Sequence, residues 1–226
     1  MGTIRFEWGD GMAFDSHLDH LLLHYFKGLP LKSPIFYNAP VGIRFEMGGD
    51  ICEAAARAEK VKSRALVLFN AINRYEDFIY FVLFMDSWDE HPVTLFEKDV
   101  YKTFNDYISG FPISEVSKQE QEYRYKGLND AGDIVTVRYY ARMKLQNLNV
   151  SPLLEAIANR SLGLEPIIDG DIYIINETNK TIFHLYDDRG LDIIAEKVEV
   201  LRGIYEQYND WILDYDRKIV DELFTL

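Results

Sequence analysis

Hydrophobic residues recur along this chain at two spacings, about 3.6 residues and two residues, and these spacings predict helices and strands. The helical spacing first appears at residues 16–27, where a stripe of leucines should be buried. A long Ala-rich run without Pro predicts a second helix that opens at Gly49 or Asp50 and ends near Asn73. Two shorter helices are predicted at residues 100–108 and 151–163.

Strand patterns lie between these helices. The continuous apolar run EDFIYFVLFMDSW, residues 76–88, predicts a strand that is covered on both faces. Residues 35–48 predict an extended segment that is broken at Pro40 and Gly42. Residues 120–126 and 133–143 predict a hairpin, because the sequence between them is rich in turn-forming residues.

The last third of the chain predicts a meander of three strands followed by two helices. The strands are expected at residues 171–176, 181–186 and 191–196, and the helices at residues 197–207 and 208–224. The last helix is predicted from an apolar stripe. Its members are Tyr208, Trp211, Ile212, Tyr215 and Ile219.

Together these elements predict an α+β fold in which an antiparallel sheet packs against helices. We expect a single domain over residues 1–226, since a chain of this length can bury a core of ordinary size. A sub-boundary is possible near residue 147, between an N-terminal α/β part (1–146) and the C-terminal meander with its helices (147–226).

Composition narrows the class of partner. The formal net charge of −13 opposes binding to nucleic acid and to anionic membrane surfaces, so a basic protein is the partner that the charge favours. A single cysteine excludes an internal disulfide and fits a reducing compartment. No secretory signal or membrane-length apolar run is present in the sequence, so we expect a cytoplasmic protein.

The stretch HLYDDRGLDII, residues 184–194, concentrates charged residues in a predicted turn. As a turn, it needs Gly190 for a positive φ angle and Asp187 to bond its own backbone, while Arg189 pairs with a neighbouring carboxylate. The acidic side chains would then face water. As a metal site, Asp187, Asp188 and Asp192, with His184, could hold a divalent ion and support a hydrolase. Their spacing is poor for this purpose, because adjacent residues of a strand, such as Asp187 and Asp188, point to opposite faces and their carboxylates do not easily meet at one ion.

Four segments of the chain resemble a bacterial family known as domain of unknown function 3885. They are Ile35–Gly48, Tyr186–Gly190, Tyr205–Leu213 and Tyr215–Arg217. The resemblance is clearest over the C-terminal fifty residues, and it implies one fold and a bacterial origin but contributes no catalytic residue. The meander followed by a helix, in a small acidic protein, also resembles the immunity proteins of bacterial toxin systems, including the SUKH superfamily.

Three other patterns in the sequence are candidate sites. His17, His20 and His24 lie along one side of the first predicted helix and could ligate zinc or nickel, although helical spacing alone is common. Cys52 falls in the first turn of the second helix, where we expect an inert small residue. RNA binding by a patch of tyrosines and arginines conflicts with the net charge. The patch comprises Tyr123, Arg124, Tyr125, Arg138, Tyr139, Tyr140 and Arg142.

Negative charge gathers at the C-terminal end, where residues 187–226 hold eleven Asp or Glu against five Lys or Arg. The leading hypothesis is a non-enzymatic, cytoplasmic protein that binds a basic protein, as a toxin-immunity protein does, and needs no cofactor. A metal-dependent hydrolase is the alternative, and the oligomeric state stays open. The candidate protein-binding residues are Asp187, Asp188, Arg189, Asp192, Asp210 and Asp214.

Overall fold

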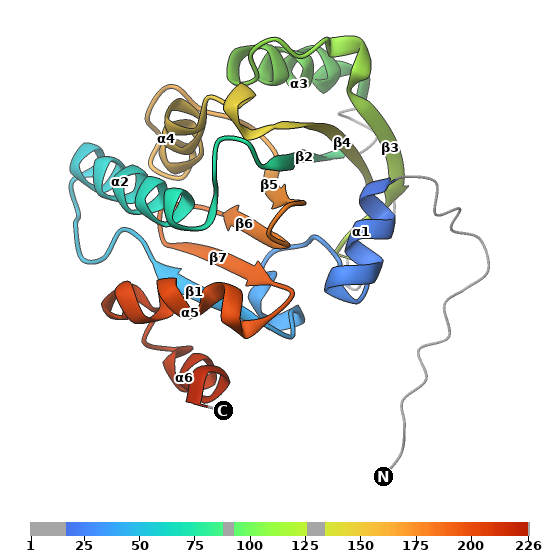
Figure 1. The fold of residues 1–226 in the computed structure, drawn as a ribbon. Helices are drawn as coiled ribbons and strands as arrows, with labels where there is room; N and C mark the ends of the chain where they lie inside the picture. The colour runs from blue at the N-terminus through green and yellow to red at the C-terminus, as the bar shows by residue number, and fades with distance from the viewer. Residues whose placement is uncertain (1–16, 88–92, 126–133, 226) are drawn as a thin grey trace.

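The computed structural model describes residues 17–87, 93–125 and 134–225, and for residues 93–96 it describes the backbone only. These residues form one seven-stranded antiparallel sheet with helices on both faces (Figure 1). The strand order is β1-β7-β6-β5-β2-β4-β3. The strands are β1 (Gly42–Glu46), β2 (Phe78–Ser87), β3 (Ser117–Glu122), β4 (Val135–Lys144), β5 (Asp171–Asn176), β6 (Thr181–Leu185) and β7 (Gly190–Ala195).

The predicted α+β class is confirmed, and so is the C-terminal meander, which is formed by β5, β6 and β7. Strands from before and after residue 147 are interleaved, because β5 pairs with β2 in the middle of the sheet. The helices are α1 (His17–Phe26), α2 (Ala54–Ile72), α3 (Val93–Tyr107), α4 (Val150–Arg160), α5 (Val198–Gln207) and α6 (Arg217–Thr225).

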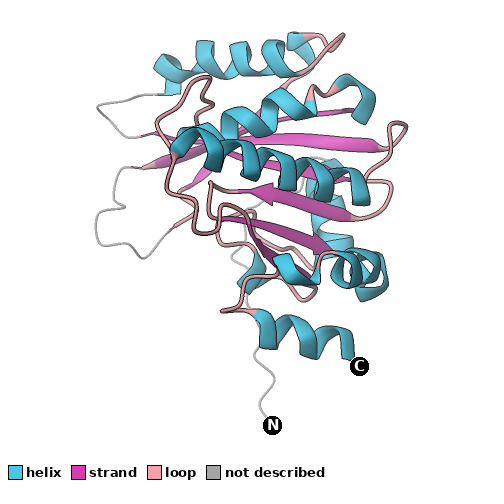
Figure 2. Cartoon of the chain, turned by 90° about the vertical axis from the view of Figure 1, so that its left-hand side faces the viewer, coloured by secondary structure: helices cyan, strands magenta, loops and turns pink. Residues whose placement is uncertain are grey.

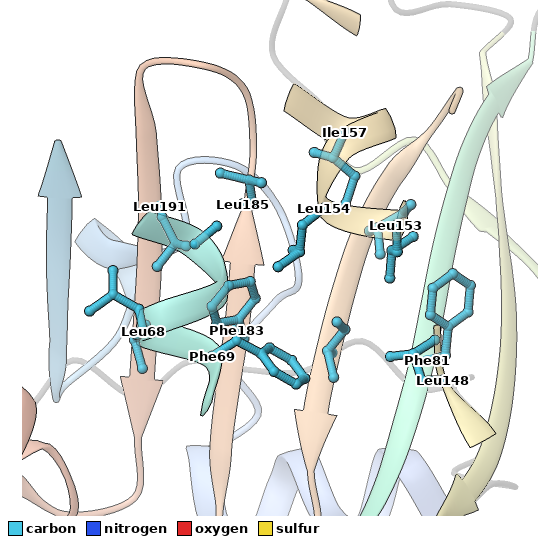
Figure 3. Close-up of a cluster of buried hydrophobic side chains, with 14 of the residues drawn as sticks. Leu68, Phe69, Phe81, Leu148, Leu153, Leu154, Ile157, Phe183, Leu185 and Leu191 are labelled. Atoms are coloured by element: carbon cyan, nitrogen blue, oxygen red, sulfur yellow. The ribbon is translucent and has the colours of Figure 1, made fainter. Parts of the chain in front are cut away.

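One face of the sheet lies under a thick helical layer, which stands in front of the strands in Figure 2. Figure 3 shows its centre, where Leu68 and Phe69 of α2 and Leu154 of α4 meet strand residues such as Phe183. The rings of Phe69 and Phe183 pack edge to face with centroids 5.1 Å apart. Phe183 and Leu185 lie on this face while Ile182 lies on the other, because successive residues of a strand point to opposite faces.

The second face is covered mainly by α1 and the segment that follows it. Leu18, Leu21 and Leu22 of α1 pack on a smaller apolar cluster that includes Tyr80 and Tyr173, which confirms the predicted leucine stripe. Because α1 is short, it leaves part of this face to polar residues. Those residues form the candidate site described below.

The predicted last helix over residues 208–224 is wrong in its first half. Residues 208–216 form a connection with only a short 3₁₀ turn, and α6 begins at Arg217. The backbone of Ile212 instead bridges to Phe45 at the edge of the sheet, and Leu213 N–H donates to the carbonyl of Arg44 (3.0 Å). Tyr215 and Ile219, expected in the buried stripe, are exposed.

Two helix starts also differ from prediction. The carboxylate of Glu53 accepts hydrogen bonds from the backbone N–H groups of Ala55 and Ala56, so α2 begins after this cap and not at residue 50. Cys52 therefore precedes the helix and is exposed. Helix α3 begins at Val93, ahead of the predicted residue 100.

Candidate functional site

Asp192, in the middle of β7, is fully buried in an ion pair with Arg44 of β1, directly opposite it in the sheet. The pair is bidentate, with Nε to Oδ1 at 2.7 Å and Nη2 to Oδ2 at 2.9 Å. The same carboxylate accepts the backbone N–H of Phe36 (3.1 Å). Buried Asp216 lies 3.7 Å from Arg44 Nη1 and accepts the hydroxyl of Tyr37 (2.9 Å), which completes a network of four side chains.

The other two aspartates of the turn have arginines of their own. Asp188 is buried and pairs with Arg57 of α2, while its backbone N–H donates to the Ser161 hydroxyl. Burial by itself would raise the pKa of Asp188, but its contacts with Ser161 and Arg57 bring that pKa below its usual value. Asp187 accepts the backbone N–H of Arg189 (2.8 Å) and pairs with its guanidinium, as the turn interpretation predicts.

These contacts correct the expectation that the aspartates of the turn face water. Asp188 and Asp192 are buried, so neither is available to a docking partner at the surface. The three carboxylates contact three different arginines and do not converge. Among the described residues, no group of three or more His, Cys, Asp or Glu side chains is placed to hold a metal ion.

The histidines of α1 are likewise spread apart. His17 Nδ1 lies 2.5 Å from the hydroxyl of Tyr80, and His24 stacks edge-on against Tyr25. His20 is exposed. The helical spacing therefore does not gather the three imidazoles around one centre.

Gly190 is required in the turn for a reason that the sequence did not reveal. It has no positive φ, in contrast to the prediction. A Cβ atom at this position would lie 1.8 Å from the hydroxyl oxygen of Tyr186. The glycine therefore provides room for the tyrosine ring, which lies over the entry to β7.

Next to this turn, at the end of the second face, lies a cleft of about 550 Å³. We call it the arginine cleft, because four arginines from separate parts of the chain line it. They are Arg44 of β1, Arg124 after β3, Arg160 at the end of α4, and Arg189 of the turn.

One wall of the arginine cleft is a buried polar network around Asp171, the first residue of β5. Its carboxylate accepts from His184 Nε2 (2.7 Å), the Tyr173 hydroxyl (2.7 Å) and Arg124 Nη1 (2.9 Å). Burial raises the pKa of Asp171, but His184 and Arg124 lower it by more, so the pKa lies well below its usual value. Burial, followed by the nearby Asp171 charge, raises the pKa of Tyr173.

This network has the residue types of a proton relay, but its imidazole has no access to a substrate. The ring of His184 is fully buried and stacks on Tyr173 at 4.0 Å between centroids, and its Nδ1 has no hydrogen-bond partner among the described residues. An ionised carboxylate only accepts hydrogen bonds, so the imidazole donates from Nε2. We therefore interpret the Asp171–His184 pair as a support for the wall of the cleft.

The tyrosine–arginine patch is not a stacking platform. Arg124 and Arg138 are buried in ion pairs, with Asp171 and with Asp19, and Tyr139 is fully buried.

Arg160 and Asp171 were not predicted as site residues. Each is an ordinary residue at the end of an element, and no local motif marks it.

Asp210 and Asp214, the remaining candidate residues, are exposed in the C-terminal connection, which we define as residues 208–216. The side chain of Asp214 is 97% exposed, and Tyr215 beside it is 85% exposed. The structure therefore divides the candidate residues into a buried set, a cleft set and an exposed set.

Comparisons with known proteins place the chain in a family. The model of the family described as "Domain of unknown function (DUF3885)" matches residues 18–216, from α1 to the end of the C-terminal connection. The chain belongs to this family. The match confirms the resemblance seen in the sequence and extends it over nearly the whole described fold.

One relative of the DUF3885 chain is "Uncharacterized protein YnaE" of Bacillus subtilis (strain 168). It is 26% identical over 203 residues, which cover 84% of this chain and 94% of the relative. No solved structure matches the chain. None of the helices in the described residues is long and apolar enough to cross a membrane.

Proposed function

We propose that the protein is a non-enzymatic binding protein that docks a basic partner protein on the C-terminal connection. The observation that carries the proposal is the side-by-side exposure of Asp214 and Tyr215. Aromatic side chains supply much of the binding energy of protein interfaces, and carboxylates around them select a partner of opposite charge. The net charge of −13 adds long-range attraction for a basic protein.

The backbone of the connection is fixed on both sides of these residues. Ile212 is buried and bridged to Phe45, and Asp216 is buried beside Arg44. Arg217 Nη1 donates to the side chain of Asn209 (2.9 Å), and Nη2 donates to its carbonyl (3.0 Å). A partner would therefore meet a preformed surface, which lowers the entropic cost of binding.

The surface extends beyond the connection on both sides. Tyr37, half exposed, is held by Asp216, and Ile219, in the first turn of α6, is exposed four residues after Tyr215. Asp210 adds a second exposed carboxylate. The proposed docking surface thus comprises three apolar or aromatic side chains and two acids.

A triple variant, Asp210→Asn, Asp214→Asn and Tyr215→Ala, tests this surface. The matched control is Glu59→Gln, Glu76→Gln and Tyr75→Ala, which removes the same charge and one exposed tyrosine elsewhere. Both proteins and the parent chain are immobilised and exposed to lysate at low and high salt. The captured proteins are then compared by quantitative mass spectrometry.

Support requires a basic protein whose capture falls about tenfold or more with the connection variant, is retained by the control, and weakens with salt. If no protein distinguishes the two variants, the proposed surface is wrong. A toxin-immunity role is the specific form of this proposal. It requires that the captured protein be toxic when expressed alone and harmless when expressed with this chain.

No enzymatic function is proposed. The alternative of a metal-dependent hydrolase needed Asp187, Asp188 and Asp192 around one ion, and each of these carboxylates is instead engaged by its own arginine.

A further inference from the structure

We propose that the arginine cleft is a binding site for a small organic oxyanion, with Arg160 as its principal anchor and Arg189 at its mouth. This inference is independent of the docking surface on the C-terminal connection. It rests on how the positive charges of the cleft are compensated.

Three of the four arginines in the cleft already have a carboxylate partner. Arg44 pairs with Asp192, Arg124 with Asp171, and Arg189 with Asp187. Asp171 is shared with His184, so it is not available to a further cation. Asp86, the third acid in the lining, lies 3.6 Å from Arg124 Nη2 and accepts the Thr136 hydroxyl, so the three carboxylates of the cleft contact groups other than Arg160.

Arg160 has no carboxylate partner among the described residues. Its guanidinium donates to two backbone carbonyls, those of Gly170 and Tyr186, and the second of these bonds is 3.2 Å long. The carbonyls orient the group but do not neutralise its charge. A half-buried cation is normally paired, so a cleft that leaves one unpaired is set up to receive an anion.

The two carbonyls also hold the guanidinium in one place. Both precede segments that form the cleft, since Gly170 leads into β5 and Tyr186 leads into the turn. A planar guanidinium fixed in this way can present its remaining N–H groups as a fork to a carboxylate or a phosphate.

Arg189 adds a second, adjustable donor. Its side chain is 75% exposed, and its one ion pair among the described residues joins it to Asp187, whose side chain is 14% exposed. Because the guanidinium end of this pair is exposed to solvent, water screens the pair, and the guanidinium can exchange Asp187 for a ligand anion. The cleft also offers the ring of Tyr186 and the side chain of Phe84 to the organic part of a ligand.

The volume limits the ligand. About 550 Å³ lies in the range of small-molecule sites, and the concave shape does not suit a nucleic acid strand or a membrane surface. A net charge of −13 repels anions from the rest of the molecule, so binding would be specific to the cleft. The ligand class is therefore a small molecule with a carboxylate or a phosphate group.

Isothermal titration calorimetry of the full chain with sodium phosphate and with sodium succinate tests the proposal, at an ionic strength held constant with sodium chloride. We expect saturable binding of at least one of these oxyanions at one site per chain, and the stronger of the two indicates the group that the natural ligand bears. Arg160→Gln should weaken this binding about tenfold or more, because a charge-assisted fork is lost.

Two further variants keep the test decisive if Arg160→Gln does not fold. Arg189→Gln should weaken binding several-fold, whereas Asp187→Asn should strengthen it, because it releases Arg189 from its competing carboxylate while keeping the acceptor of the turn. Arg202→Gln, on the exposed side of α5, is the control and should leave affinity unchanged. Absence of saturable binding by either oxyanion, or a folded Arg160→Gln or Arg189→Gln with the parent affinity, overturns the proposal.

Discussion

Two acidic regions of this protein, the turn at residues 187–192 and the C-terminal connection at 208–216, look alike in sequence and differ in structure. In the turn, each aspartate engages an arginine, and two of the three are buried. In the connection, Asp210 and Asp214 are exposed, and only Asp216 is buried. The same residue type thus builds the interior in one region and is presented at the surface in the other.

The difference follows from the position of each carboxylate relative to the sheet. Asp192 is fully buried within β7, which is paired on both sides, and there a charge must be paired to be tolerated. Asp214 lies on a loop outside the sheet, and its contact with Arg217, 3.3 Å away, is exposed and contributes little. Acidic composition alone therefore does not tell a structural carboxylate from one that can bind a partner.

The largest effect is expected from Asp192→Ala. It leaves Arg44 charged and buried, with Asp216, 3.7 Å away, as the one acid paired with it among the described residues, so we expect the free energy of unfolding to fall by about 3–5 kcal/mol. Urea denaturation followed by circular dichroism measures the change.

A double variant, Arg44→Met with Asp192→Leu, tests whether the loss comes from an unpaired buried charge or from any substitution at these two positions. Because it removes both charges, it should recover much of the lost stability. A loss below about 1 kcal/mol in Asp192→Ala would show that the turn is not built on this pair.

The next effect concerns packing in the turn. Gly190→Ala forces the Tyr186 ring to move, and we expect a loss of roughly 1–3 kcal/mol in the free energy of unfolding. Combining it with Tyr186→Ala should make the Gly190 change nearly neutral in that background. If Gly190→Ala costs the same with and without the ring, the steric explanation fails.

The third effect in size is the dependence of stability on pH, which should differ between the two regions. A carboxylate whose pKa is lower in the folded protein than in the unfolded chain stabilises the fold above the unfolded pKa, and that stability is lost as pH falls below about 4. Asp188 and Asp171 meet this condition. Asp188→Asn should therefore reduce the stability difference between pH 7 and pH 3. Denaturation at both pH values measures it, and an unchanged difference would contradict the pairing.

The smallest effect on stability is expected in the connection. Asp210→Asn with Asp214→Asn should change the free energy of unfolding by no more than about 0.5 kcal/mol, since both side chains are exposed. The same urea titration checks this. A larger loss would place these residues among the structural carboxylates and weaken the case for a docking surface.

Most of the fold could be predicted because its signals are local. The apolar run of β2 and the alternation of Phe183 with Ile182 each report burial within a few residues of sequence. The start of the last helix could not be predicted this way. Ile212 has helical spacing with its neighbours, but its backbone pairs with Phe45, far away in sequence, and that contact determines the local structure.

The candidate site was predictable only in part for the same reason. The bond from Asp187 to the backbone of Arg189 spans two residues, and sequence reasoning found it. The arginine partners of Asp192 and Asp188 lie 148 and 131 residues away, so the turn gives no sign of them. The unpaired charge of Arg160 depends on every contact around it and has no sequence signature at all.

The bridge between Ile212 and Phe45 has a consequence for self-association. A sheet that ends in an unpaired strand can recruit a strand from a second molecule, which leads to aggregation. Here β1, at one end of the strand order, is covered by the segment that contains Ile212, while β3, at the other end, has the charged sequence SKQEQE. The residues that present Asp214 and Tyr215 to solvent thus also protect the molecule from polymerising along its own strands.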